Sequence, residues 1–315
     1  MIEKIEALRS EVAKAVVGQE KMIDGLLVGL LTGGHILIEG VPGLAKTTTV
    51  NALAKALGLD FKRAQFTPDL LPSDILGAEI YDPKDNGFKI KHGPIFTNLL
   101  LADEINRAPA KVQSALLEVM QEKQVTIGDE TFKLDLPFFV MATQNPVEQE
   151  GVYQLPEAQL DRFMMKLVVG YNTKEEELEV ARRVASGVVP DLKAVLSKAD
   201  LEKIKKDVVA IHMDEELERY IVDIVEASRN PLDFGLGDIA EYIQFGASPR
   251  ATIDLFRASR AMAYLRGKDF VTPVDVAYVV KEVLRHRIII SYEAEAEDVT
   301  TDQIIDVIMQ RVAIP

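Results

Sequence analysis

The segment 40–47, with the sequence Gly-Val-Pro-Gly-Leu-Ala-Lys-Thr, restricts the possible folds of this chain more than any other. A short apolar run, 35–39, precedes it and is typical of a buried strand, whereas residues 48–58 are good helix formers that end in glycine. A strand, a glycine-rich turn ending in Lys-Thr and a helix form the arrangement of a phosphate-binding loop. The alternative interpretation is an ordinary strand–turn–helix connection.

The chemistry of such a loop follows from its backbone. Small residues let successive N–H groups surround a β-phosphate, and the helix N-terminus adds partial positive charge. We expect Lys46 to reach the β- and γ-phosphates and the Thr47 hydroxyl to ligate Mg²⁺. Ala45 stands where the usual pattern has its second glycine, which is tolerable if that residue is already helical. The predicted nucleotide-binding residues are Gly40, Val41, Pro42, Gly43, Leu44, Ala45, Lys46, Thr47 and Thr48.

The composition excludes several kinds of chemistry. The chain has no cysteine, so disulfides and thiolate catalysis are impossible. Its four histidines are scattered and lack the spacing of metal ligands. The net charge of −14 repels nucleic acid unless a basic patch is locally concentrated, and the sequence has only short basic clusters. The charge therefore argues against a nucleic-acid motor without excluding one.

The apolar segments indicate a protein without membrane insertion. Residues 1–18 carry Glu and Lys throughout, with apolar residues at helical spacing rather than in the unbroken core of a signal peptide. The longest apolar tract, 25–38, is interrupted by Thr-Gly-Gly-His and is too short to span a bilayer. We expect a cytoplasmic location.

The periodicity of the chain divides it into two domains. Up to about residue 173, apolar runs predict strands of a parallel sheet with flanking helices, and alternating runs around Asn86-Gly87 and Gly128-Asp129 predict two β-hairpins, at 78–90 and 124–136. Beyond residue 173 only helical periods remain. The predicted helices cover residues 174–186, 199–208, 214–228, 249–266, 273–285 and 301–312. We expect an α/β nucleotide-binding domain over 1–188 and an all-helical domain over 189–315.

Two adjacent acids follow the apolar run 99–102. A strand that carries Asp103 and Glu104 at its carboxyl end, in the same sheet as a phosphate loop, matches the second half of a nucleotide-hydrolysing site. Asp103 would hold Mg²⁺ and Glu104 would polarise the attacking water. Taken alone, two acids after a strand are weak evidence.

Three further polar residues allow two interpretations each. Asn145 follows the next apolar strand and could contact the attacking water and the γ-phosphate, but Asn-Pro also starts turns. Arg162 follows an Asp and is either a surface ion pair or an arginine finger for a neighbouring subunit. Arg250 lies in the first turn of a predicted helix, where a cation is unfavourable, so it suggests an anionic partner such as phosphate.

Together these motifs resemble an AAA+ ATPase, and more narrowly the MoxR family. The resemblance covers nearly the whole chain in family order and depends on several motifs at once. They are residues 16–19 (Val-Val-Gly-Gln), 40–47, 102–108 (Ala-Asp-Glu-Ile-Asn-Arg-Ala), 142–146 (Ala-Thr-Gln-Asn-Pro), 149–151 (Gln-Glu-Gly), 155–163 (Leu-Pro-Glu-Ala-Gln-Leu-Asp-Arg-Phe) and 246–250 (Gly-Ala-Ser-Pro-Arg).

The resemblance implies roles for individual residues. Asn145 becomes the sensor 1 residue, Arg162 the arginine finger and Arg250 the sensor 2 arginine, with Arg250 acting on its own or on a neighbour's nucleotide. Val17 and Gly18 resemble the segment that lines the adenine pocket. The hairpins resemble the helix-2 and pre-sensor-1 inserts of one AAA+ clade, and an Ala before the loop Lys is common in the family.

The resemblance also implies assembly and partners. Its members form rings, usually hexamers, bind ATP with Mg²⁺ between subunits, and act as chaperones on client proteins or their metal cofactors. Some work with partners that contain a von Willebrand factor A domain. Three functions follow as hypotheses: a MoxR-type chaperone ATPase, a ring-shaped nucleic-acid motor or loader, and a non-hydrolysing nucleotide-gated scaffold. The last requires a degenerate site, whereas Lys46, Asp103, Glu104 and Arg162 are all present.

Overall fold

The computed structural model describes residues 2–41, 43–84, 86–146, 152–188 and 190–315. At its centre lies a five-stranded sheet in the order β2-β5-β8-β1-β9, in which every neighbouring pair is parallel. The strands are β1 (Ile36–Glu39), β2 (Phe61–Gln65), β5 (Leu99–Asp103), β8 (Phe139–Gln144) and β9 (Met165–Val168). All carboxyl ends therefore lie at one edge of the sheet, as the predicted α/β fold requires.

The central strands are apolar throughout because both faces of the sheet are covered. Along β5, Leu99 and Leu101 point into one hydrophobic core, and Leu100 and Ala102 into the other. The first core contains α1 (Ile2–Ala13), α2 (Glu20–Thr32) and α3 (Lys46–Ala56). The second contains α4 (Pro72–Leu76) and α5 (Ala110–Glu122). This alternation explains why these strands read as unbroken apolar runs.

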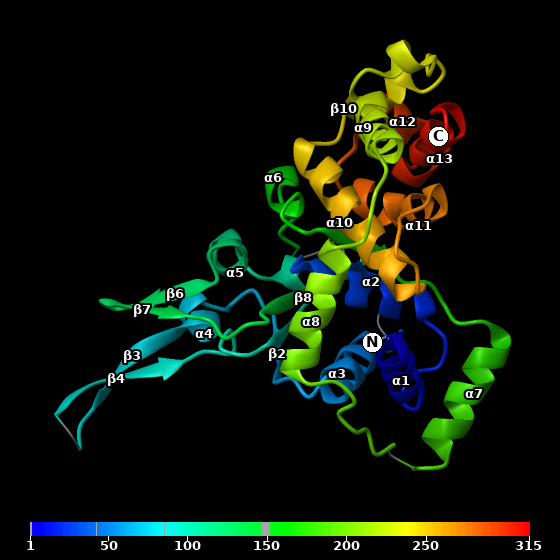
Figure 1. The fold of residues 1–315 in the computed structure, drawn as a ribbon. Coiled ribbons are helices and arrows are strands. Elements are labelled where there is room, and N and C mark those ends of the chain that lie inside the picture. The colour runs from blue at the N-terminus through cyan, green and yellow to red at the C-terminus, as the bar shows by residue number, and fades with distance from the viewer. Residues whose placement is uncertain (1, 42, 85, 147–151, 189) are drawn as a thin grey trace.

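Helices dominate the C-terminal part, and the first core extends into it without a break. Helix α10 (Pro249–Leu265) packs against α2 and joins this C-terminal part, called the lid below, to the sheet domain (Figure 1). The helices after β9 are α7 (Lys174–Ala185), α8 (Lys198–Val209), α9 (Glu215–Arg229), α10 (Pro249–Leu265), α11 (Pro273–Leu284), α12 (Tyr292–Ala296) and α13 (Thr301–Arg311), with 3-10 turns η2 (Pro231–Phe234) and η3 (Ala240–Tyr242). The predicted helices agree with these bounds to within about two residues.

Both predicted hairpins are present as two-stranded antiparallel sheets. They are formed by β3 (Gly77–Asp82) with β4 (Gly87–His92), and by β6 (Gln124–Ile127) with β7 (Glu130–Lys133). Figure 1 shows them projecting together from the sheet domain, on the left of the view. They lie against each other, since the Glu79 carboxylate approaches the turn at Gly128 closely.

The prediction of an all-helical lid was wrong in one detail. Strands β10 (Ile243–Phe245) and β11 (Ile289–Ile290) form a small antiparallel sheet. These strands are too short for alternation to reveal them, and each finds its partner far along the chain. In the described part of the chain, no helix is long and apolar enough to cross a membrane.

Candidate active site

The phosphate loop joins the carboxyl end of β1 to the first turn of α3, as the sequence predicted. It forms one wall of a cavity of about 360 Å³. Asp103 at the end of β5 and Asn145 after β8 line the same cavity, opposite Lys46. The cavity is lined by Gly43, Leu44, Ala45, Lys46, Thr47, Thr48, Arg63, Asp103, Glu104, Thr143, Gln144 and Asn145. The structure thus brings the residues of the two motifs together, and Pro42 lies outside the described residues.

The loop backbone explains two of its small residues. A Cβ at Gly40 would lie 2.9 Å from the backbone oxygen of Val169, so a side chain does not fit there. Gly43 has φ of +87°, a conformation that favours glycine. Ala45 does not meet the condition under which a methyl group is tolerable there, because it is not helical: it has φ 54° and ψ 16°, in the left-handed region. The second glycine of the usual loop pattern would adopt this conformation without strain.

Lys46 is held inside the cavity. Its Nζ donates a hydrogen bond to the backbone oxygen of Gly40 at 2.6 Å. Burial lowers the pKa of its ammonium group below the usual range, while the carboxylates of Asp103, Glu104 and Glu39 oppose this shift. The positive charge is therefore incompletely solvated and incompletely neutralised, which favours an incoming phosphate.

A buried threonine connects the two acids. Thr143 of β8 donates its hydroxyl proton to Asp103 Oδ1 at 2.6 Å and accepts a hydrogen bond from the backbone N–H of Glu104 at 2.8 Å. Glu104 has φ of +56°, which is uncommon for a residue with a side chain and is often found at functional sites. The strand end and the 3-10 turn η1 (Ile105–Arg107) that follows thus fix the directions of both carboxylates.

The side chains that pair with these acids were not predicted from the sequence. Arg63 of β2 donates its Nε to Asp103 Oδ2 at 2.9 Å, and Gln65 donates to Glu104 Oε2 at 2.7 Å. Arg107 forms an ion pair with Glu104 at 3.2 Å. Gln65 lies directly beside Asp103 in the sheet register. No sequence motif indicated Arg63 or Gln65, because their contacts depend on the pairing of β2 with β5.

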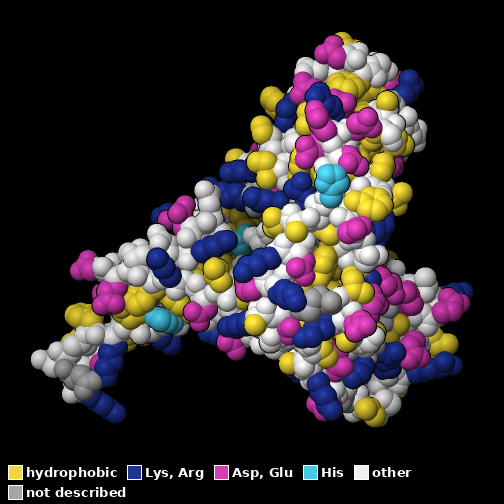
Figure 2. Space-filling model, in the orientation of Figure 1, with side chains coloured by type: hydrophobic (Ala, Val, Ile, Leu, Met, Phe, Trp, Pro, Cys, Tyr) yellow, Lys and Arg dark blue, Asp and Glu magenta, His cyan; other side chains and the backbone are white. Residues whose placement is uncertain are grey.

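Arg162 and Arg250 lie elsewhere. Both line a second cavity of about 370 Å³, together with His35 and Met164, which directly precede β1 and β9. This cavity is at the amino ends of the strands, whereas Lys46 is at the carboxyl ends. Figure 2 shows Lys and Arg side chains gathered in the hollow between the lid and the hairpins, where α6 (Glu157–Leu160) lies in Figure 1. One chain therefore does not bring its own Arg162 and Arg250 to its own phosphate loop.

The second cavity is held together by Asp161. This carboxylate accepts hydrogen bonds from Arg250 Nη1 at 3.1 Å and from the Ser248 hydroxyl. Arg287, whose side chain is 1% exposed, donates its Nε to Asp161 at 2.8 Å and its Nη2 to Asp254 at 2.6 Å. The anionic partner that the sequence suggested for Arg250 is thus a carboxylate of the sheet domain in this structure, and it ties the lid to the residue next to Arg162.

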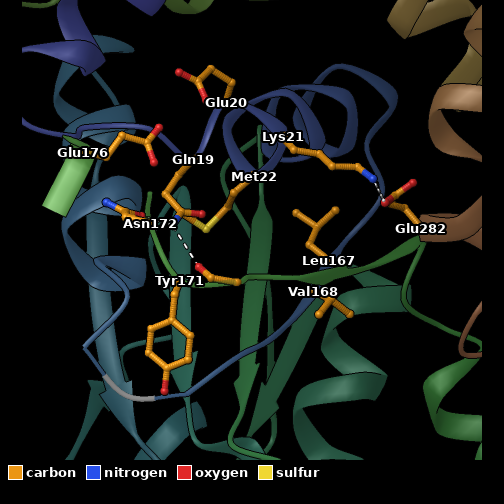
Figure 3. A pocket seen from close by; sticks show the side chains of 11 residues that line it. Gln19, Glu20, Lys21, Met22, Leu167, Val168, Tyr171, Asn172, Glu176 and Glu282 are labelled. Atoms are coloured by element: carbon orange, nitrogen blue, oxygen red, sulfur yellow. Dashed lines mark hydrogen bonds and ion pairs between the residues drawn. The ribbon is translucent and has the colours of Figure 1, made fainter. Parts of the chain in front are cut away.

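Val17 and Gly18, which resemble the segment that lines the adenine pocket, lie beside a third cavity. Asn172 Nδ2 donates to the backbone oxygen of Val17 at 3.3 Å, and Gly18 has φ of +68°. Gln19 lines the cavity, which measures about 300 Å³, and donates to Asn172 Oδ1 at 2.7 Å. Figure 3 shows Gln19 and Asn172 at one side of this cavity and the ion pair of Lys21 with Glu282 of the lid at the other. The sequence analysis did not assign Gln19 or Asn172.

The chain matches known proteins over both domains. Residues 35–165 match the model of the ATPase family associated with various cellular activities (AAA), and residues 237–308 match an AAA lid domain. Over 315 residues the chain is 48% identical to Chaperone MoxR1 of Mycobacterium tuberculosis, which covers 100% of this chain and 83% of that protein. The chain belongs to the MoxR family of AAA+ ATPases.

Other relatives agree with this membership of the MoxR family. Protein MoxR of Paracoccus denitrificans is 33% identical over 305 residues, which span 90% of this chain and 88% of that protein. A solved structure from Cytophaga hutchinsonii has a TM-score of 0.95 and 55% identity, and the match covers 100% of this chain and 96% of that one. The residues that match the AAA model include Lys46, Glu104 and Arg162, and those that match the lid model include Arg250.

Proposed function

We propose that this MoxR-family chain hydrolyses ATP to ADP and phosphate, with Mg²⁺, at a site that two subunits of a ring complete together. The observation that carries the proposal is the separation of the catalytic groups within one chain. Lys46 and Glu104 line a cavity at the carboxyl ends of the sheet, and Arg162 and Arg250 line one at the amino ends. A head-to-tail neighbour can bring the second set to the first.

The residues of the first cavity fit magnesium and a triphosphate. Asp103 and Thr47 offer the oxygen ligands that Mg²⁺ prefers, and the described residues contain no cluster of three His, Asp or Glu side chains that would replace phosphate and water as ligands. When bound, the ion would neutralise charge on the β- and γ-phosphates. Asp103 and Thr47 would hold it.

The protein groups then perform the remaining tasks. Lys46 binds the phosphates, and Glu104 accepts a proton from the water that attacks the γ-phosphorus. The bond from that phosphorus to the β–γ bridging oxygen breaks, and ADP leaves with the electron pair. Asn145, in the same cavity, orients the water. A neighbour's Arg162 stabilises the charge on the transferred group, and Arg250 reads the nucleotide state.

The output of the cycle is mechanical. Arg250 belongs to the lid and Asp161 to the sheet domain, so exchange of the Arg250–Asp161 contact for a phosphate would change how the two domains meet. We propose the division into domains 1–188 and 189–315 for this motion. The work is done in the cytoplasm on client proteins or their metal cofactors, with a von Willebrand factor A domain protein as partner and a hexamer as the ring.

Subunit mixing tests the shared site. Every site in a ring of Arg162→Ala lacks the arginine, and every site in a ring of Glu104→Gln lacks the base. Each variant alone should therefore be nearly inactive, although the first keeps an intact Lys46 site and the second an intact Arg162. In a 1:1 mixture, about a quarter of the sites join a functional Glu104 to a neighbour's functional Arg162, and we expect ATPase activity of that order. If the mixture is no more active than its components, the site is not shared in this way.

The nucleic-acid motor makes a different prediction. It requires ATP hydrolysis that DNA stimulates and that salt suppresses, because phosphate contacts release counterions. With a net charge of −14 we expect no stimulation by single- or double-stranded DNA. A clear stimulation that disappears at higher salt would favour the motor.

Failure of Glu104→Gln to slow hydrolysis would refute the assignment of the base.

A further inference from the structure

Helix α7 is unusual because none of its residues is buried. Its apolar side chains nevertheless recur at helical spacing, at Leu178, Ala181, Val184 and Ala185, as on a helix that packs against a core. Leu178 is 52% exposed and Val184 75% exposed. In Figure 1 the helix stands at the lower right edge of the molecule, apart from the sheet and the lid. It thus presents a contact surface that this chain does not use.

The polar side of α7 faces the protein instead. Arg183 Nη1 donates to the backbone oxygens of Ala13 and Lys14, at 2.8 and 3.2 Å. The Glu176 carboxylate lies against Gly18, where an added Cβ would be 2.6 Å from Oε1. At about 100° per residue, Arg183 and Glu176 lie roughly opposite Ala181 on the helix. The helix is therefore oriented with its apolar stripe outward.

The position of α7 connects it to the nucleotide site. It follows β9, the edge strand beside β1, and its first turn lies close to Gly18. The residue after β9, Val169, touches Gly40 of the phosphate loop. Helix α7 therefore begins at the carboxyl edge of the sheet, and the cavity of Arg162 lies at the amino edge. Figure 1 shows α6, next to Arg162, and α7 on opposite sides of the molecule.

We infer that the apolar stripe of α7 docks on helix α10 of the next subunit, beside that subunit's Arg162 and Arg250. The inference rests on the proposed shared site, because a neighbour that offers Arg162 to Lys46 must approach this edge. On α10, Arg250, Ile253 and Arg257 lie on one side at spacings of three and four and line the cavity. Ile253 is 50% exposed and offers the apolar contact.

Charge supports this pairing. The first turn of α7 carries Glu175, Glu176 and Glu177, whereas cations predominate around the receiving surface. They are Lys123, Arg162, Arg250 and Arg257, against Asp161 and Asp254. Glu176 is turned toward Gly18 of its own chain and the last turn is basic, so the charge match rests on Glu175 and Glu177, which would approach a basic surface with an exposed isoleucine.

The first experiment removes the stripe. We would make Leu178→Ser with Val184→Ser in the Glu104→Gln background, add ATP and Mg²⁺, and measure assembly by sedimentation velocity. We expect the ring to dissociate at concentrations where the Glu104→Gln parent stays assembled, with unchanged circular dichroism because α7 buries nothing. Val222→Ser, which removes an exposed valine of α9, is the matched control and should assemble normally.

The outcomes separate the two proposals. Normal assembly of the stripe variant overturns the docking of α7 on a neighbour and leaves the stripe to a client or another partner. A Glu104→Gln parent that stays monomeric with ATP refutes the ring itself, before α7 is tested.

Cross-linking tests the geometry, and the absence of native cysteine makes it clean. Val184→Cys and Ile253→Cys proteins would be mixed with ATP and treated with a short bismaleimide. We expect linked dimers only in the mixture. Linkage within Val184→Cys alone would show twofold pairing, and absence of linkage in the mixture would show a different neighbour. Either result overturns the inference.

Discussion

The two edges of the central sheet carry cavities of nearly equal size but different composition. At the carboxyl edge, about 360 Å³ is lined by the phosphate loop and by acids that are already paired with Arg63, Gln65 and Arg107. At the amino edge, about 370 Å³ is dominated by cations, and the lid supplies part of the wall. The two cavities thus have complementary contents, as a site shared between two copies would require.

The largest expected effect tests the amino edge alone. Arg162→Ala should lower kcat by roughly a thousandfold or more, because an arginine finger stabilises charge that develops only during phosphoryl transfer. Nucleotide affinity of the isolated chain should stay unchanged, since Arg162 does not line the Lys46 cavity. Steady-state kinetics and titration with a fluorescent nucleotide would measure both. A matching loss of affinity would mean that the two edges are not independent.

A substitution at Arg287 tests how much its ion pairs at the amino-edge cavity stabilise the fold. Arg287→Met leaves the carboxylates of Asp161 and Asp254 without their buried partner, which should cost about 3 kcal/mol of unfolding free energy. Burial raises the pKa of Asp254 and the guanidinium of Arg287 opposes the rise, so the variant should lose less stability at low pH than at neutral pH. Urea unfolding at the two pH values would measure this. Equal losses would argue against a charge effect.

A substitution at Lys46 tests nucleotide binding at the carboxyl edge. Lys46→Ala should weaken nucleotide binding roughly 100-fold, because charge-assisted hydrogen bonds to phosphate are lost. The nucleotide-free protein should not become less stable, since the lowered pKa means that the folded state pays to hold this ammonium charged at pH 7. Calorimetric titration and thermal unfolding without nucleotide would check the two parts. A large fall in Tm would contradict the second.

The smallest effect concerns His35, which lines the amino-edge cavity. His35 accepts a hydrogen bond from Val140 N and contacts the backbone oxygen of Met120, and burial lowers its pKa to about 4. The folded state thus disfavours the proton that the unfolded state accepts near pH 6.5, so stability is full above that pH and falls toward pH 4. We expect a loss of about 2 kcal/mol between pH 7 and 5.

A second buried histidine adds to the pH dependence of stability. The pKa of His286 is lowered by burial in the same direction. The His35→Gln variant should therefore reduce, but not abolish, the dependence of urea unfolding on pH. An unchanged pH dependence in that variant would show that His35 does not contribute.

The carboxyl edge could be predicted from the sequence, because its groups are consecutive in short motifs. Lys46, Asp103 and Glu104 each follow a strand that reads as an apolar run. Arg63 and Gln65 could not, since their contacts depend on the register of β2 against β5. The left-handed conformation of Ala45 could not be read from the sequence, because residue type alone does not report the backbone strain of a tight loop.

The amino edge was harder to predict. The pattern correctly suggested that Arg250 has an anionic partner, but Asp161 is distant in sequence and belongs to the other domain. The same holds for Arg287, which no motif indicated and which makes several contacts with the segment that carries Arg162. Long-range ion pairs of this kind follow from tertiary packing.

The pairing of Arg63 with Asp103 has a consequence for the timing of the cycle. The resting site carries its own internal cation, so a magnesium nucleotide must compete with a guanidinium that is half exposed and already attached. In the proposed cycle, loading would be an exchange of counterions, and the release of products would leave no bare carboxylate behind. Arg63 would thereby weaken the apparent affinity of the subunit for the proposed magnesium nucleotide.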